Sequence, residues 1–312
     1  MKVVYVLTSS REDFYLEQLL LSISSLRQYN EKVEICVLTD SNTLESFDGI
    51  RNLSSVGLEP MRVECPVDLT QKERSRFLEF EMRKVIRGNF LYIDTDTVVA
   101  DSLEEIEKCP GHVCAVRDKH TKIITRPVVS VLKKSKLPFP RQFDYFNSGL
   151  IFSRDTQEAA KFFEDWKTLW SNYETNTFWL DQPAFNFSNI INDHIIQELD
   201  GSWNCQLFRN GVKYLAEAKV IHYYPANDIN NPYVLAYNNW LLKIRNNHYK
   251  IPSEISEMLR TPKSLIFPSS RVVTRENHIM TLDSSIFWYV SERLIRHKIL
   301  FKILNKVFSY LD

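Results

Sequence analysis

The sequence predicts an α/β fold, a mostly parallel sheet flanked by helices on both faces. Apolar segments rich in β-branched residues alternate with segments of helical periodicity from residue 3 to residue 93, and such alternation requires crossovers between parallel strands. The 312 residues are 44% hydrophobic and 25% charged, an ordinary globular composition. One large domain, or slightly more, is therefore expected.

The first half of this sheet begins with a βαβ unit. Residues 3–8 and 33–38 read as strands, and residues 14–29 between them have apolar side chains at helical spacing. A third apolar run covers residues 61–63, residues 70–87 read as a helix, and residues 90–93 form a fourth strand. Ligands bind beyond the carboxyl ends of such strands, so the residues after position 93 are candidates for a site.

Two aspartates follow the fourth strand directly. Asp94 and Asp96 flank Thr95, and residues i and i+2 of an extended strand point to the same side. The two carboxylates can therefore converge on one divalent cation, for which oxygen ligands favour Mg²⁺ or Mn²⁺. The alternative is turn chemistry, because Asp and Thr are common where strands end.

The middle of the chain returns to the same alternation after a basic segment. Residues 119–141 carry seven Lys or Arg and no acidic residue; we expect a mobile loop, either a solvated insertion or a contact for an anionic acceptor. Residues 144–152 and 220–221 read as strands, and residues 156–170 as a helix.

Charge, cysteine content and hydropathy argue against several classes of protein. The 39 basic and 39 acidic residues balance, unlike a nucleic-acid-binding protein held by phosphate neutralisation. Five scattered cysteines favour reduced thiols and a cytoplasmic location. The N-terminal apolar run is too short for a signal peptide, and no uncharged apolar stretch approaches the ~18 residues of a membrane span. An integral membrane protein is not expected.

The last third of the chain has a different pattern. Pro252, Pro262 and Pro268 are expected to break it into short helices and loops. Residues 284–311 mix aromatic and aliphatic side chains with Lys and Arg, which suits either a helix at the inner face of a membrane or a terminal helix packed on protein. We therefore divide the chain into a main domain, residues 1–227, and a helical extension, residues 228–312.

Four motifs appear in order within the main domain. They are Asp-Thr-Asp at 94–96, Tyr-Phe-Asn-Ser-Gly-Leu at 145–150, Leu-Asp-Gln-Pro-Ala-Phe-Asn at 180–186 and Ile-His-Tyr at 221–223. Each motif is a weak signal alone. Because all four occur in this order after a βαβ unit, the chain resembles glycosyltransferase family 8 and related nucleotide-sugar enzymes with the Rossmann-like GT-A fold. The resemblance spans roughly residues 3–224.

The resemblance implies a metal site. In the family, two aspartates and a later histidine hold Mn²⁺ on the donor's diphosphate, which carries over to Asp94, Asp96 and His222. An imidazole ligand tilts the preference from Mg²⁺ towards Mn²⁺, and the metal stabilises charge on the departing nucleoside diphosphate. Without the other motifs, a histidine at a strand end is more often structural.

The resemblance also implies donor contacts, at Thr8, Arg76, Asp94, Thr95, Asn147, Ser148 and Gly149, and a catalytic pair, Asp181 and Gln182. Arg76 suits phosphate or sugar hydroxyls, and Gly149 permits close backbone approach. Without the resemblance, the same residues have structural interpretations. Arg76 would be a residue on a solvated helix face, residues 147–149 would form a turn, and Asp181 would cap a helix. The capping role is compatible with catalysis.

The chain departs from the family pattern at two places. No Gly-x-x-Lys-Pro-Trp segment follows His222, so the diphosphate's cation is unassigned; Lys213, Lys219 or a residue of the basic segment are candidates. The loop at residues 8–11 lacks the acidic residue that contacts the nucleotide in many members, which leaves the identity of the nucleotide's base open.

The expected activity is metal-dependent transfer of a sugar from a nucleotide sugar, with UDP as the expected nucleotide, to a hydroxyl of a glycan or lipid-linked acceptor in cell-surface polysaccharide biosynthesis. Retention of anomeric configuration is what the resemblance implies. Two rivals stay open: a haloacid dehalogenase-type phosphatase, whose motif residues 93–98 superficially match, and an inactive nucleotide-sugar-binding protein.

Overall fold

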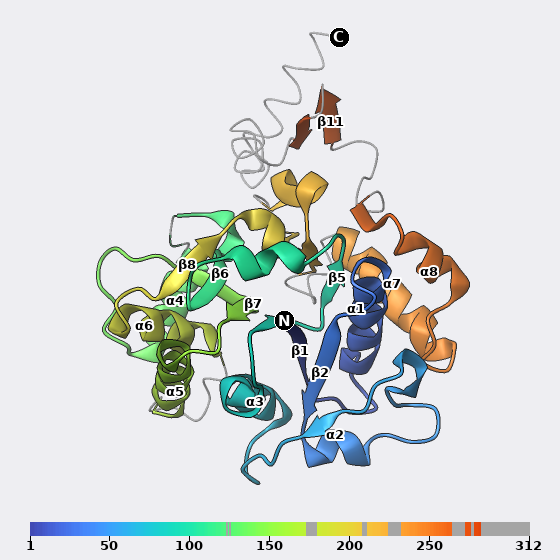
Figure 1. The fold of residues 1–312 in the computed structure, drawn as a ribbon, viewed down its shortest axis with the longest axis horizontal. Helices are drawn as coiled ribbons and strands as arrows, with labels where there is room; N and C mark the ends of the chain where they lie inside the picture. Colours follow the sequence, from blue (N-terminus) through green and yellow to red (C-terminus); the bar gives the residue numbers. More distant parts are fainter. Residues whose placement is uncertain are drawn as a thin grey trace, which may run out of the picture.

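The computed structural model describes residues 1–122, 124, 126–172, 180–207, 211–223, 232–263, 272–275 and 278–281. Its centre is a seven-stranded sheet in the order β3-β2-β1-β4-β7-β6-β8 (Figure 1). The strands are β1 (Lys2–Leu7), β2 (Glu34–Thr39), β3 (Met61–Arg62), β4 (Phe90–Ile93), β6 (Val113–Arg117), β7 (Phe146–Ser153) and β8 (Ile196–Leu199). Only β7 is antiparallel to its neighbours, which confirms the mostly parallel α/β fold.

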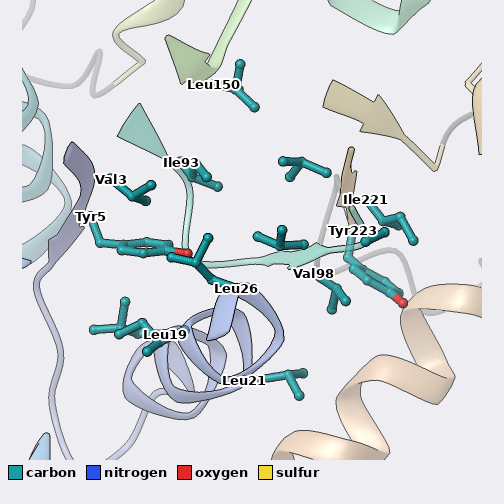
Figure 2. Close-up of a cluster of buried hydrophobic side chains, with 14 of the residues drawn as sticks. Val3, Tyr5, Leu19, Leu21, Leu26, Ile93, Val98, Leu150, Ile221 and Tyr223 are labelled. Atoms are coloured by element: carbon teal, nitrogen blue, oxygen red, sulfur yellow. The ribbon is translucent and has the colours of Figure 1, made fainter. Parts of the chain in front are cut away.

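Helices cover both faces of this sheet because side chains alternate along its buried strands. In β1, Tyr5 belongs to a core shared with α1 (Tyr15–Tyr29), whereas its neighbour Val4 belongs to a core shared with α3 (Gln71–Val85), α5 (Gln157–Ser171) and α6 (Gln182–Ile191). Figure 2 shows Tyr5 and Ile93 above Leu19 and Leu26 of α1. Helix α3 starts with a capping box between Thr70 and Glu73.

A second, three-stranded sheet carries the chain across the end of β4. It has the order β5-β10-β9, with β5 (Thr97–Val99), β9 (Cys205–Gln206) and β10 (Val220–His222). β5 begins one residue after Asp96, and β10 runs antiparallel to it with His222 opposite Thr97. Two segments more than 120 residues apart in sequence therefore meet beside the two aspartates.

The basic segment contains a helix, α4 (Arg126–Ser135), so the prediction of a loop is wrong for these residues. Proline is tolerated in a first helical turn, and Val128 is 8% exposed, while α4 lies against α6. The many lysines of the segment drew attention away from the apolar residues of this helix. The remaining short helices are α2 (Ser41–Glu45) and the 3₁₀ helices Ser54–Val56, Glu104–Lys108, Asp118–His120, Gly201–Asn204 and Val212–Glu217.

The cysteine prediction requires a correction as well. Cys109, after the 3₁₀ turn at Glu104–Lys108, forms a disulfide with Cys114 of β6, and the chain between them bends at Gly111 and His112. Cys36, Cys65 and Cys205 are free. The count and spacing of cysteines did not reveal that two of them approach each other across a turn.

The extension begins with α7 (Pro232–Asn246), which lies along α1 (Figure 1). Arg245 pairs with the buried Glu17 of α1, and Tyr237 and Leu241 enter the same core as Tyr5. Next come α8 (Ser253–Met258), which begins after Pro252, and the hairpin β11 (Val272–Arg275) and β12 (His278–Thr281). Residues 284–311 lie outside the described residues, so the membrane or packing helix stays a prediction. Within the described ranges, no helix combines the length and apolar character needed to cross a bilayer.

Candidate active site

Asp94, Asp96 and His222 meet at the carboxyl end of β4, with one ligand atom from each lying within 4.8 Å of the others. Nε2 of His222 is 3.1 Å from Oδ1 of Asp96 and 3.8 Å from Oδ2 of Asp94. The two aspartates converge in a bend between β4 and β5, and not through the pleat of an extended strand. The Thr97 hydroxyl, which donates to the Asp94 carbonyl at 2.7 Å, closes that bend.

The three groups perturb one another's protonation. Burial and the neighbouring Asp96 raise the pKa of Asp94 to about 6, although His222 opposes the shift. Burial also disfavours ionised Asp96, but His222 outweighs it and lowers the pKa of Asp96. Burial lowers the pKa of His222, but the two aspartates outweigh it and raise that pKa. A divalent cation would relieve the repulsion between the two carboxylates.

Asn204 orients the imidazole. Its side-chain nitrogen donates to Oδ1 of Asn147 at 2.9 Å, which leaves its own Oδ1, 2.9 Å from Nδ1 of His222, as the acceptor. Nδ1 of His222 therefore carries the proton of this hydrogen bond, and Nε2 faces the two aspartates. A second partner of this kind fixes the tautomer of a metal-binding histidine, and sequence patterns gave no signal for Asn204.

Gly149 leaves the space in which these groups meet. A Cβ atom at this position would lie 2.5 Å from both Oδ2 of Asp94 and Cε1 of His222. The Gly149 carbonyl also accepts the Asp94 N–H at 2.9 Å, so the backbones of β4 and β7 are in direct contact here. Two carboxylates and an imidazole around this Cβ-free space are a donor set that fits a divalent cation.

A polar network continues from this centre to the start of α6. The side-chain nitrogen of Asn147 lies 3.3 Å from Oε1 of Gln182 and 3.4 Å from Oδ1 of Asp118, and the Ser148 N–H donates to Gln182 at 3.4 Å. Burial raises the pKa of Asp118. Asp118 was missed in the sequence, although it follows strand β6 directly, as Asp94 follows β4.

Arg76 joins this group from α3. Its Nε lies 3.1 Å from Oδ1 of Asp181, and its Nη1 donates to Oε1 of Glu79 at 2.5 Å. Asp181 occupies the N-cap position of α6, but its side chain caps no backbone N–H. The helix-cap interpretation is therefore wrong, because the carboxylate turns to the arginine instead. Glu79 is a further residue that sequence patterns did not identify.

The remaining predicted residues lie at the edges of the site. The Thr8 hydroxyl donates to the Gln71 carbonyl at 3.1 Å, and the Thr95 hydroxyl to Gln18 at 3.2 Å; none of their described contacts reaches Asp96 or His222. Tyr15, which was missed, is 37% exposed and lies within electrostatic reach of Asp96 and Arg76. An aromatic residue at the start of the helix after β1 was the available signal.

The structure also shows where the two lysines lie that were considered as the cation for the donor's diphosphate. Lys219 precedes β10, whereas His222 ends it, and the Lys219 ammonium pairs with Asp101 at 3.3 Å. It therefore lies at the wrong end of the strand to meet a phosphate at the Asp94 cluster. The Lys213 ammonium lies 4.8 Å from the centre of the Tyr214 ring, which packs against His120.

Comparisons with solved structures show the fold of the chain. Among solved structures, WbbM, a bifunctional glycosyltransferase, superimposes with a TM-score of 0.55 and 18% identity over 79% of this chain, which spans only 51% of WbbM. The galactosyltransferase LgtC, solved with donor and acceptor sugar analogues, gives a TM-score of 0.51 and 14% identity over 78% of this chain and 96% of its own. Both have the GT-A fold.

At the level of sequence, no curated protein matches the chain. A family model does match: that of glycosyl transferase family 8 aligns with residues 6–227, which contain all four motifs and every residue of the candidate site described above. This protein is therefore a glycosyltransferase that belongs to glycosyl transferase family 8.

Proposed function

We propose that this glycosyltransferase takes its sugar from a nucleotide sugar, with UDP as the expected nucleotide, and that it requires a divalent metal, Mn²⁺ or Mg²⁺. The convergence of Asp94, Asp96 and His222 around the Cβ-free space at Gly149 carries this proposal. When bound, the metal supplies Lewis-acid stabilisation of the charge on the departing diphosphate.

The chain's own residues then have distinct tasks in the proposed reaction. Asp94, Asp96 and His222 would hold the metal, while Thr8, Arg76, Thr95, Asn147, Ser148 and Gly149 would bind the donor. Asn147 and Ser148 fix the amide oxygen of Gln182, which supports a role for Asp181 and Gln182 beside the anomeric carbon. We assign neither a covalent step. Retention of configuration rests on family membership alone.

The acceptor is proposed to be a hydroxyl of a glycan or of a lipid-linked glycan, in the synthesis of a cell-surface polysaccharide in the cytoplasm. Peripheral membrane contact through residues 284–311 belongs to the same proposal. Membership of the family sets aside the phosphatase alternative. Family membership also argues for an enzyme over an inactive nucleotide-sugar-binding protein, and donor turnover is the measurement that separates the two.

Replacement of Asp96 by Asn tests the proposal. It keeps the size of the side chain but removes a charge from the metal centre, so donor hydrolysis in the presence of Mn²⁺ should fall to background while the circular dichroism spectrum is unchanged. Asp68→Asn, at an exposed position before α3, is the matched control. Turnover by Asp96→Asn at the wild-type rate would refute the metal assignment.

A further inference from the structure

The β1–α1 loop, residues 8–14, lies at the same edge of the sheet as the candidate metal centre. Strands β1 and β4 are parallel neighbours, so their carboxyl ends meet at this edge. Helix α1 follows the loop, and its Gln18 side chain accepts a hydrogen bond from the hydroxyl of Thr95, between the two aspartates, at 3.2 Å. A nucleotide whose diphosphate binds at these aspartates would therefore have the β1–α1 loop beside it.

Asp13 fixes the internal shape of this loop. Its Oδ1 accepts the Ser9 hydroxyl at 2.7 Å and the Tyr15 N–H at 3.1 Å. Its Oδ2 accepts the Ser10 N–H and the side-chain nitrogen of Gln71, both at 2.7 Å. Burial disfavours the ionised form of Asp13, but these hydrogen bonds outweigh it and lower its pKa. The loop is thus ordered from within and joined to the start of α3.

The extension holds the end of this loop through Arg245 of α7, the helix that lies along α1 (Figure 1). Its Nη2 donates to the Asp13 carbonyl, and its Nε donates to the carboxylate of Glu17 in the first turn of α1. Its Cζ lies 3.9 Å from the centre of the Phe14 ring. Glu17 is fully buried, whereas the Arg245 side chain is 24% exposed. One guanidinium thus contacts both the loop and the helix that follows it.

This contact comes from outside the part of the chain that matches the family. The match ends at residue 227, whereas α7 begins at Pro232. Membership of the family therefore assigns no role to Arg245. The guanidinium has a fixed planar fork of N–H groups, so a single side chain can hold a carbonyl and a carboxylate at once.

We propose that Arg245 is a positioning residue for the donor's nucleotide, because it holds the β1–α1 loop and the first turn of α1 in place. The inference rests on the proposed function, in which the diphosphate lies at Asp94 and Asp96. A loop that is already ordered loses less conformational freedom on binding, so the nucleotide binds more tightly. The metal ligands are fixed by other groups, including Gly149 and Asn204. Arg245 therefore acts on nucleotide binding and not on the metal.

Arg245→Lys tests this proposal in the full chain. The lysine keeps a positive charge near Glu17, but one ammonium cannot reproduce the fork that also meets the Asp13 carbonyl. We expect the Kd of UDP in saturating Mn²⁺, measured by calorimetry, to rise about fivefold or more, while the Kd of Mn²⁺ alone is unchanged. In turnover, KM for the donor should rise and kcat should stay near wild type. Arg260→Lys, the same change at an exposed position of the extension, should alter none of these values.

A second variant keeps the test decisive if Arg245→Lys does not fold. The double variant Glu17→Gln with Arg245→Gln removes both charges and leaves no buried carboxylate unpaired, and the same selective loss of UDP affinity is expected. Wild-type UDP affinity in a folded variant, or an equal loss of Mn²⁺ affinity, would overturn the inference. Failure of both variants to fold would also overturn it, because the arginine would then serve the fold. If the wild-type chain itself does not bind UDP with Mn²⁺, the proposed function fails instead.

Discussion

At the candidate metal centre, His222 and Asp94 are each fixed by a neighbour from another part of the chain, and Asp94 also by a residue of β4, the strand before it. Asn204 holds His222, the Gly149 backbone holds Asp94, and Tyr92 donates its hydroxyl to the Asp94 carboxylate. Sequence motifs pointed to Asp94, Asp96 and His222 themselves, because the two aspartates are local and His222 closes a family motif. They could not identify Asn204, Glu79 or Asp118, because only tertiary contacts give these residues a role.

Adding one carbon at Gly149 should disable the metal centre. In Gly149→Ala the new methyl group would overlap Oδ2 of Asp94 and the His222 ring, so one of them must move. We expect Mn²⁺ affinity, measured by calorimetry, to fall at least about tenfold, with a loss of ~1–3 kcal/mol in the free energy of unfolding. Gly49→Ala, where nothing lies within 4 Å, is the control; unchanged metal affinity in Gly149→Ala would contradict the geometry.

Removal of the Asn204 amide tests how the histidine is oriented. Without the acceptor for Nδ1–H, the imidazole of His222 can adopt the other tautomer or turn, so Asn204→Ala should weaken Mn²⁺ binding by about 10–100-fold. Asn239→Ala, on the exposed side of α7, provides the comparison. A dissociation constant within about twofold of wild type would show that Asn204 does not support the ligand.

At the scale of elements, the antiparallel pairing of β5 with β10 places His222 opposite Thr97, next to Asp96. The periodicity of the sequence predicted the strands and helices of the first βαβ unit, since their apolar patterns are local. The same periodicity missed α4, because the lysines around it hid its apolar spacing. It also missed the Cys109–Cys114 disulfide, because the two cysteines approach each other only when the chain between them bends. The pairing of β5 with β10 joins distant segments, and no local pattern specifies it.

Helix α7 connects the extension to the candidate metal centre through aromatic stacking. The Tyr237 ring stacks on that of Tyr223 at 4.1 Å, and the Tyr223 N–H donates to the Asp96 carbonyl at 3.0 Å. Figure 2 shows Tyr223 pointing towards this helix. The first helix after residue 227 thus supports a backbone group of the site.

Two substitutions of Tyr237 separate packing from polarity. The ring is fully buried and its hydroxyl has no hydrogen-bond partner within the described residues. Tyr237→Ala should therefore lower the free energy of unfolding in urea by ~3–5 kcal/mol, whereas Tyr237→Phe should be neutral or slightly stabilising. A loss below ~1 kcal/mol in the alanine variant would mean that α7 does not pack on the core as described.

At the scale of the whole molecule, the mostly parallel sheet and the order of four motifs were enough to predict the fold and the family. The composition of the chain identified neither the donor sugar nor the acceptor, because both are selected by side chains that meet only after folding. Arg76 illustrates this: in the sequence it is one of several basic residues of a helix, and in the structure its two carboxylate partners define its charge environment.

Metal binding should stabilise the folded chain as a whole. A ligand that binds only the folded state at about 100 times its dissociation constant adds ~2.7 kcal/mol to the free energy of unfolding. Thermal and urea unfolding with saturating Mn²⁺ should show this increase, and EDTA should remove it. Asp96→Asn should abolish the increase while Asp68→Asn keeps it; an equal increase in both variants would place the metal elsewhere.

The most direct test of the central claim is release of nucleoside diphosphate from a panel of nucleotide sugars, followed with Mn²⁺ and again with EDTA. We expect release from one donor, a UDP-sugar, and its loss when EDTA removes the metal. Equal release with and without EDTA, or no release from any donor in the presence of metal and glycan acceptors, would contradict a metal-dependent glycosyltransferase with its centre at Asp94, Asp96 and His222.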